Sequence, residues 1–148
     1  MNIYFAAPWF TPEQMDIHSR VHDVLKASRH RIFSPKHEME VSHDAPASVR
    51  RRAFVQNLVQ IQNSDFILAV TDYKDVGTIF ECGYAFRSGR PILYYAETLG
   101  DRPFNLMLAE SGIRVVRATT ELAELLDRIE SKRDLQVVSQ QTYEGSIE

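Results

Sequence analysis

The order of apolar and amphipathic segments is the feature of this sequence that most restricts its fold. Five short apolar runs alternate with segments that have helical periodicity. The runs are residues 2–7 (NIYFAA), 30–35 (HRIFSP), 65–72 (DFILAVTD), 91–96 (PILYYA) and 113–118 (IRVVRA). The five-residue apolar core of the third run (FILAV) is typical of a strand in a sheet that is covered on both faces. We therefore predict one α/β domain over residues 1–148, with a five-stranded parallel sheet and helices on both faces.

The segments between the runs carry helix start and stop signals. The expected helices are residues 11–28, 48–64, 77–87, 106–111 and 119–132. Thr11 can cap the first helix, in which Pro12 takes the first position, and Gly89 can end the third in a left-handed conformation. Residues 36–48 have no clear period and are expected to form a loop. The side chains expected to face inward from the second helix are Ala53, Phe54, Leu58 and Ile61, with Val55 as a further candidate.

Composition and charge exclude several classes of partner. The formal net charge is −3 and the pI about 6.0, so we expect no general attraction to nucleic acid polymers or anionic membranes. No apolar run approaches the roughly 18 residues of a membrane span, and the N-terminus lacks the basic region of a signal peptide. Cys82 is the only cysteine, so an intrachain disulfide is impossible. These features predict a cytoplasmic protein.

Glu81 lies in a segment that is otherwise built to be buried, DYKDVGTIFECGYAF at 72–86. Asp72 and Asp75 precede it at the expected carboxyl edge of the sheet, where ligands bind in folds of this kind. Gly77 allows the backbone to approach a ligand closely. Two carboxylates in one cleft are the usual equipment for glycosidic chemistry, with one as nucleophile. The simpler alternative is a glutamate near a helix N-terminus that only complements the helix dipole.

Four segments together resemble one enzyme family. They are IYFAAPWFT near the N-terminus, DVGTIFECGYAFRSGR in the middle, RPFNLM after the fourth run and YEGSIE at the end. Their sequence and order resemble those of nucleoside 2-deoxyribosyltransferases of the lactobacillal type. The resemblance implies a flavodoxin-like fold, transfer of 2-deoxyribose from a deoxyribonucleoside to a free nucleobase, and no metal or organic cofactor. It also implies a homo-oligomer, built from dimers and reaching hexamers, with shared active sites.

The resemblance assigns roles residue by residue. Glu81 matches the nucleophile, Tyr4 the tyrosine that orients it, and Asp75 the aspartate that holds a sugar hydroxyl. Asn105 matches an asparagine lent by a neighbouring subunit, with Met107 beside it. The aromatic residues around the base are matched by Trp9 and Phe10, and the tail at about 133–148 is expected to contribute to the site or to an interface.

The match has one departure, at the residue near the base. The family usually has an aspartate in its second helix that helps to protonate the leaving base, and the aligned residue here is Asn57. An amide can hydrogen-bond a base edge but cannot act as a general acid. Asp72, in the loop after the third strand, is the candidate to replace it.

Three alternatives compete with the transferase. His18 and His22 lie one helical turn apart, but no third ligand has a convincing spacing, so a metal site is not expected. Arg50–Arg52 begin the second helix and can supply the phosphate site of a related hydrolase that cleaves nucleoside 5′-monophosphates. A solvated basic face is the simpler interpretation of this cluster. A nucleotide-binding module without catalysis is the third alternative.

Overall fold

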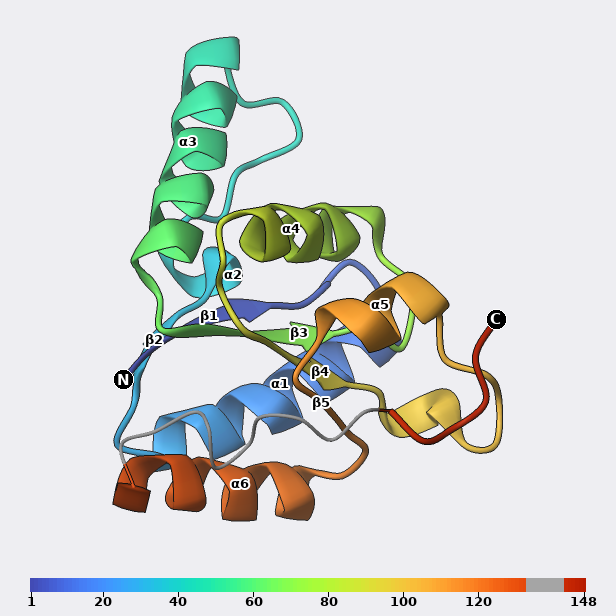
Figure 1. Ribbon diagram of the computed structural model, residues 1–148. Coiled ribbons are helices and arrows are strands. Elements are labelled where there is room, and N and C mark those ends of the chain that lie inside the picture. The colour runs from blue at the N-terminus through green and yellow to red at the C-terminus, as the bar shows by residue number, and fades with distance from the viewer. Residues whose placement is uncertain (133–142) are drawn as a thin grey trace.

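The computed structural model describes residues 1–132 and 143–148, and it confirms the predicted α/β fold. Figure 1 shows a five-stranded sheet with helices on both of its faces. All strand pairs are parallel, in the order β2-β1-β3-β4-β5. The strands are β1 (Asn2–Ala6), β2 (Arg31–Phe33), β3 (Phe66–Val70), β4 (Ile92–Tyr95) and β5 (Arg114–Val116). The helices are α1 (Pro12–Ala27), α2 (Pro35–Glu38), α3 (Ala47–Asn63), α4 (Val76–Arg87), the 3₁₀ turn η1 (Glu97–Leu99), α5 (Leu106–Ser111) and α6 (Thr119–Lys132).

The period-two alternation of the strands divides the core between the two faces of the sheet. Ile3 and Phe5 point toward the face covered by α1 and α6, where Ile17 and Leu126 meet them in one buried cluster. Tyr4 points to the opposite face, which α3, α4 and α5 cover in Figure 1. The side chains that pack with it include Ile61, Cys82, Ala85 and Phe104. This alternation places the Tyr4 hydroxyl on the same side of the sheet as α4.

The local signals at the ends of the helices are mostly realised. Thr11 forms a capping box with Gln14 at the start of α1, and Gly89 has a φ of 68° after the end of α4. The expected loop over 36–48 is wrong at its start, because Pro35 opens the short helix α2. Proline has the fixed φ that suits a first helical position, and four residues are too few to show a period.

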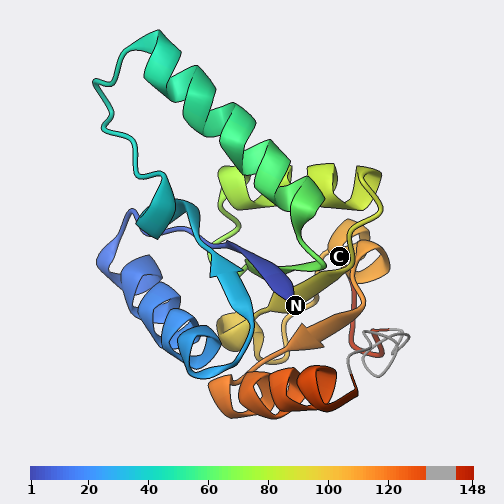
Figure 2. The same ribbon diagram turned by 90° about the vertical axis from the view of Figure 1, so that its left-hand side faces the viewer.

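Helix α3 departs from the expected burial pattern. Ala53 and Ile61 are buried and Leu58 is partly buried, but the side chain of Phe54 is 41% exposed. Figure 2 shows why, since the N-terminal part of α3 projects beyond the rest of the molecule and covers no sheet there. The prediction that Phe54 faces the core is therefore wrong for this chain. Of the helices that the structure describes, none combines the length and apolar character needed to cross a bilayer.

Candidate active site

A tyrosine–glutamate pair lies between the sheet and α4. The Tyr4 hydroxyl donates a hydrogen bond of 2.5 Å to Oε1 of Glu81. Tyr4 is completely buried in β1, and Phe33 of the neighbouring strand stacks on its ring at 5.6 Å. The strands β2 and β3 on either side of β1 hold Tyr4 in place. Its hydroxyl therefore fixes the orientation of the Glu81 carboxylate. The two residues are 77 positions apart in the sequence, and the parallel β1–β3 pairing brings them together.

The surroundings of the pair change its acid–base properties. Burial raises the pKa of Glu81 to about 7, the hydrogen bond from Tyr4 opposes that rise, and the charge of Asp75 adds to it. Burial and the adjacent Glu81 also hold the pKa of Tyr4 far above its usual value, so the phenol remains protonated. A carboxylate that titrates near neutrality beside a fixed donor is typical of a catalytic group.

Asp75 and Gly77 form the entrance to α4. Asp75 is the N-cap of the helix, and its Oδ2 accepts hydrogen bonds from the Thr78 amide at 2.8 Å and the Thr78 hydroxyl at 3.0 Å. A Cβ atom added at Gly77 would lie 3.1 Å from the same Oδ2. Glycine therefore leaves room for the aspartate to turn back over the helix end.

The aromatic segment after β1 lies against a group of histidines. The rings of Trp9 and Phe10 are 5.0 Å apart, and Phe10 is 69% exposed. Behind them His18 is buried, with neither ring nitrogen hydrogen-bonded, and burial lowers its pKa to about 3. His37 of α2 joins His18 and His22, with ring centroids 4.1 to 5.9 Å apart. Even so, no three His, Cys, Asp or Glu side chains in the described parts of the chain are arranged to hold a metal ion.

Asn57 occupies the inward stripe of α3. It lies one turn from both Ala53 and Ile61, and Ile61 belongs to the same buried cluster as Tyr4. Its Oδ1 is buried and has no hydrogen-bond partner. A buried amide oxygen without a partner costs free energy unless a ligand or water completes it.

A second group of the predicted site residues surrounds a cavity of about 560 Å³. The residues that line it include Asp72, Lys74, Ile79, Arg102, Asn105, Met107 and Glu148. Neither Tyr4 nor Glu81 is among its lining residues. Asn105 caps α5, with Oδ1 accepting from the Met107 amide at 3.1 Å, and the Met107 side chain is 74% exposed. Asp72, Asn105 and Met107 thus share a cavity that Tyr4 and Glu81 do not line.

The arginine cluster and the tail complete the account of the predicted residues. Arg50–Arg52 are all exposed on the projecting part of α3, and the Arg51 guanidinium lies 5.6 Å from the centre of the Phe54 ring. In the described part of the tail, Ser146 and Glu148 exchange backbone hydrogen bonds with Phe104, and Lys74 pairs with the Glu148 side chain at 2.5 Å. The remainder of the predicted tail, 133–142, lies outside the described residues.

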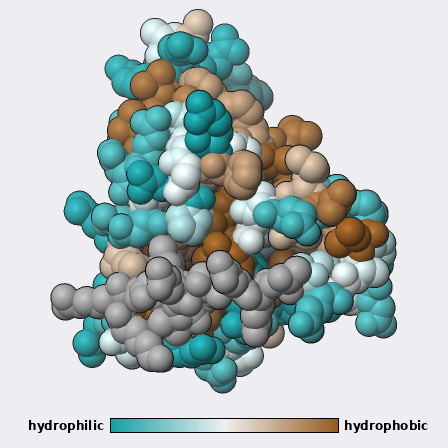
Figure 3. All heavy atoms as spheres, viewed as in Figure 1, coloured by the Kyte–Doolittle hydropathy of each residue, from teal (hydrophilic) through white to brown (hydrophobic). Residues whose placement is uncertain are grey.

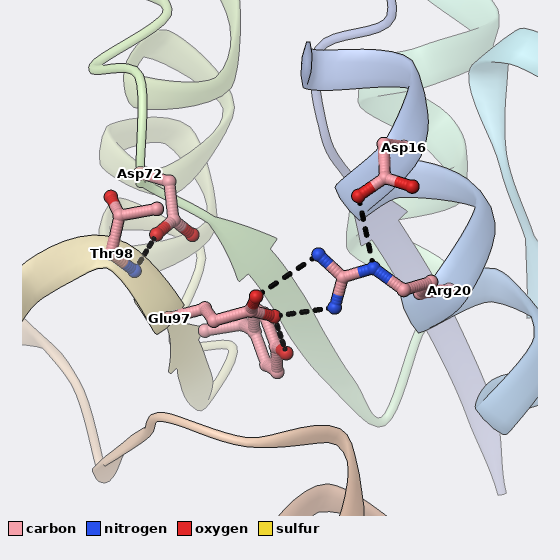
Figure 4. A network of polar contacts seen from close by, with 6 residues as sticks. Asp16, Arg20, Asp72, Glu97 and Thr98 are labelled. Carbon is pink, nitrogen blue, oxygen red and sulfur yellow. Dashed lines mark hydrogen bonds and ion pairs between the residues drawn. The ribbon is translucent and has the colours of Figure 1, made fainter.

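One network at the sheet edge was missed by the sequence analysis. Arg20 of α1 makes a bidentate contact with Glu97, through Nη1 at 2.6 Å and Nη2 at 3.0 Å. The next residue, Thr98, donates its amide to Oδ1 of Asp72 at 2.5 Å (Figure 4). Since 77 residues separate Arg20 from Glu97, spacing in the sequence could not have indicated the pair.

The fold indicates the class of protein, and comparisons with known proteins agree with it. The strand order 2-1-3-4-5 is that of flavodoxin-like proteins. The sequence model of the family described as Nucleoside 2-deoxyribosyltransferase matches residues 3–124. The chain therefore belongs to the nucleoside 2-deoxyribosyltransferase family. No curated protein sequence matches it.

Solved structures share the fold at low sequence identity. A 2-deoxyribosyltransferase from Bacillus psychrosaccharolyticus superposes with a TM-score of 0.79 at 23% identity, covering 97% of this chain and 99% of that one. The 2-desoxiribosyltransferase from Leishmania mexicana gives 0.50 at 24% identity, over 70% and 67% of the two chains. A CMP N-glycosidase from Clostridium botulinum gives 0.56 at 13% identity, over 89% and 99%. At these identities the likeness establishes the fold.

Proposed function

We propose that this protein transfers a 2-deoxyribosyl group from a deoxyribonucleoside to a free purine or pyrimidine base, a reaction of nucleoside salvage. The observation that carries the proposal is the hydrogen bond of 2.5 Å from Tyr4 to the partly buried Glu81. A binding module gains little from burying a carboxylate, because burial of a charge costs free energy. A glycosyl-transfer enzyme needs such a group as its nucleophile.

The proposed reaction has two displacements at the anomeric carbon. Tyr4 occupies Oε1 of Glu81, so Oε2 attacks the carbon, and the bond to the base breaks with its electrons on the base nitrogen. The acceptor base then attacks the glycosyl ester from the opposite face and releases the carboxylate, and the proton that the acceptor loses returns to the acid that protonated the leaving base. Two inversions give net retention. The transition state resembles an oxocarbenium ion, which the ionised carboxylate stabilises and which a sugar without a 2-hydroxyl forms more easily.

The other predicted residues bind the substrate in this proposal. Oδ2 of Asp75 is used by the cap, which leaves Oδ1 to accept from a sugar hydroxyl. Gly77 allows the sugar to approach the helix end. Trp9 and Phe10 provide flat apolar surfaces for the base, and the buried amide of Asn57 hydrogen-bonds its edge.

Protonation of the leaving base requires an acid other than Asn57. Asp72 is our candidate, since its Oδ1 is held by the Thr98 amide and its Oδ2 is buried without a partner. A carboxylic acid in such a position can donate a proton, whereas an amide cannot. Asp72 lines the cavity with Asn105 and Met107, so the second group of site residues supplies the acid in this scheme.

We further propose that a second copy of the chain completes each site. The exposed apolar side chains of α4 and α5 are Val76, Phe80, Phe86, Leu106 and Met107. In Figure 3 hydrophobic atoms gather over the neighbouring parts of these two helices. A surface of this kind is usual for a protein interface. Asn105 and Met107 of one subunit would then approach the Tyr4–Glu81 pair of its partner, and the cavity that Asn105 and Met107 line within one chain does not include Tyr4 or Glu81.

Mixed oligomers test the shared site. Glu81→Ala and Asn105→Ala chains should each be nearly inactive alone, and mixing them after mild dissociation should restore roughly a quarter of the wild-type rate per site, since some hybrid sites receive both intact residues. The measurement is transfer activity before and after mixing, with light scattering to give the subunit number. A fully active monomer, or mixtures no more active than their components, would contradict the proposal.

Two incubations separate transfer from hydrolysis. With deoxyinosine and adenine, we expect deoxyadenosine and hypoxanthine in equal amounts, because the glycosyl ester of Glu81 reacts with the acceptor base and not with water. With a deoxyribonucleoside 5′-monophosphate alone, we expect little free base. The candidate phosphate-binding residues, Arg50–Arg52, lie on the projecting part of α3. Chromatography of the products measures both. Release of base from the monophosphate at a higher rate than transfer would favour the N-glycosidase alternative, and no turnover in either would favour the binding module.

A further inference from the structure

We propose that Arg20 is a positioning residue of this site, acting through Glu97 on the β4–α5 loop, residues 96–105. The inference rests on the proposed function, because it assigns Asp72 and Asn105 to the site. Arg20 touches neither of them. It links α1, on one face of the sheet, to the β4–α5 loop. That loop holds Asp72 through the Thr98 amide and contains Asn105.

All three nitrogens of the Arg20 guanidinium donate to carboxylate oxygens. Nη1 and Nη2 bind the two oxygens of Glu97, and Nε donates to Oδ2 of Asp16 at 3.0 Å. Glu97 also accepts from the hydroxyl of Tyr95 at 2.5 Å. Tyr95 is the last residue of β4 and is completely buried, so the network is anchored in the core. The hydrogen bonds from Arg20 lower the pKa of Glu97, which keeps the pair ionised at neutral pH.

The contact is transmitted to Asp72 over a single residue. Thr98 follows Glu97 directly, and its amide donates to Oδ1 of Asp72 at 2.5 Å. The position of η1 therefore sets the direction of Oδ2 of Asp72. The position of η1 depends in turn on the contacts that hold Glu97. Asp72, Thr98 and Asn105 all line the same cavity, so a shift of η1 changes that cavity directly.

The loop has other tertiary hydrogen bonds at its two ends and at its turn. The Ala96 amide donates to the Val116 carbonyl at 2.9 Å, Nη1 of Arg117 donates to the Gly100 carbonyl at 3.1 Å, and the Phe104 amide donates to the Ser146 carbonyl at 2.8 Å. Arg102 donates to the carbonyl groups of Thr98 and Leu99, which closes the loop on itself. Gly100 has a φ of 55°, a conformation that lets the chain turn back. The three tertiary bonds hold Ala96, Gly100 and Phe104, whereas the Arg20–Glu97 pair is the contact that holds η1 to α1.

The pair is not required to hold α1 on the sheet. Ile17, Val21 and Leu25 are buried and pack α1 into the core on their own. The side chains of Arg20 and Glu97 are 40% and 32% exposed, and exposed ion pairs contribute little to stability. Loss of Arg20 should thus free the loop without unfolding the protein. Small displacements of groups that position a substrate can reduce rates by one or two orders of magnitude.

The test compares Arg20→Ala with a matched variant just after the same helix. Arg29 lies near the far end of α1 and pairs with Glu130 of α6 at 3.6 Å, so Arg29→Ala also removes an arginine and an ion pair. We expect Arg20→Ala to lower kcat/KM for transfer roughly tenfold, with a melting temperature close to that of Arg29→Ala. Arg20→Lys should recover only part, since an ammonium group cannot make the bidentate contact. Glu97→Gln should lower kcat/KM to a similar extent. The double variant Arg20→Ala/Glu97→Gln should lose no more kcat/KM than Arg20→Ala alone, because each single substitution already disrupts the same Arg20–Glu97 contact.

Hydrogen exchange provides a readout that does not depend on activity. The amide of Thr98 should exchange faster in Arg20→Ala and remain protected in Arg29→Ala. Faster exchange together with the loss in kcat/KM supports the proposal. Wild-type kcat/KM in Arg20→Ala, or an equal loss in Arg29→Ala, overturns it whatever the exchange shows. If the wild-type protein performs no transfer, the proposed function fails, and unchanged exchange at Thr98 would independently show that Arg20 does not hold the loop.

Discussion

Glu81→Ala should lose deoxyribosyl transfer by several orders of magnitude, because the variant has no carboxylate to form the glycosyl ester. The fold should persist. Burial raises the pKa of Glu81 from 4.5 to about 7, so the stability contributed by its protonated form is lost as the pH rises from about 4.5 to about 7. At neutral pH the substitution removes a carboxylate that burial disfavours but leaves the Tyr4 hydroxyl without its acceptor, so we expect only a small change in melting temperature. The measurements are transfer rate by chromatography and thermal unfolding. Glu124 is exposed on α6, and Glu124→Ala is the matched control that should keep wild-type activity.

A trapped intermediate identifies the nucleophile directly. A donor with a 2-fluoro-arabinosyl sugar reacts slowly, since the fluorine destabilises the positive charge of the transition state. Mass spectrometry of the wild-type protein should then find the sugar on the peptide that contains Glu81. A sugar on a different carboxylate, such as Asp72, would reassign the role, and near-wild-type turnover by Glu81→Ala would end the proposal.

Tyr4→Phe should move the acid limb of the pH–rate profile to higher pH. Glu81 attacks in its ionised form, so the rate falls as the pH drops below about 7. The hydrogen bond from Tyr4 lowers the pKa of Glu81, so its loss raises that pKa and leaves less carboxylate at neutral pH. A hydrogen bond to a charged group is worth about 1.5 to 3 kcal/mol, so the rate at pH 7 should fall roughly ten- to a hundredfold. At higher pH the loss should become smaller.

The control for the Tyr4→Phe variant is a different tyrosine, which lies on α4. Tyr84 lies one turn after Glu81, and its hydroxyl accepts from Nε2 of Gln62 at 2.6 Å. Tyr84→Phe also removes one phenolic oxygen, but it should leave the acid limb where it is. If Tyr4→Phe has a wild-type profile, the ionisation that limits the rate does not belong to the Tyr4–Glu81 pair.

The fold could be predicted because its signals are local. Each strand lies in a short apolar run of the length expected in a parallel sheet, and the longer helices carry their own apolar stripes. The cap at Thr11 and the stop at Gly89 depend on residues within one turn of themselves. Phe54 shows the limit of this reasoning. Its place in an apolar stripe predicted burial, but α3 extends past the sheet at that point, and nothing in the stripe itself specifies the length of the sheet below it.

The sequence by itself determined the family, the type of fold and the candidate nucleophile, because Glu81 lies in a motif of adjacent residues. Only the tertiary structure decided which residues share a site. It joins Tyr4 to Glu81, places Asp72 and Asn105 around a cavity that neither of those two lines, and links Arg20 to Glu97. The physical reason is that parallel strands bring together chain segments far apart in the sequence. Their side chains meet according to strand order and register, which are fixed by the packing of the whole domain.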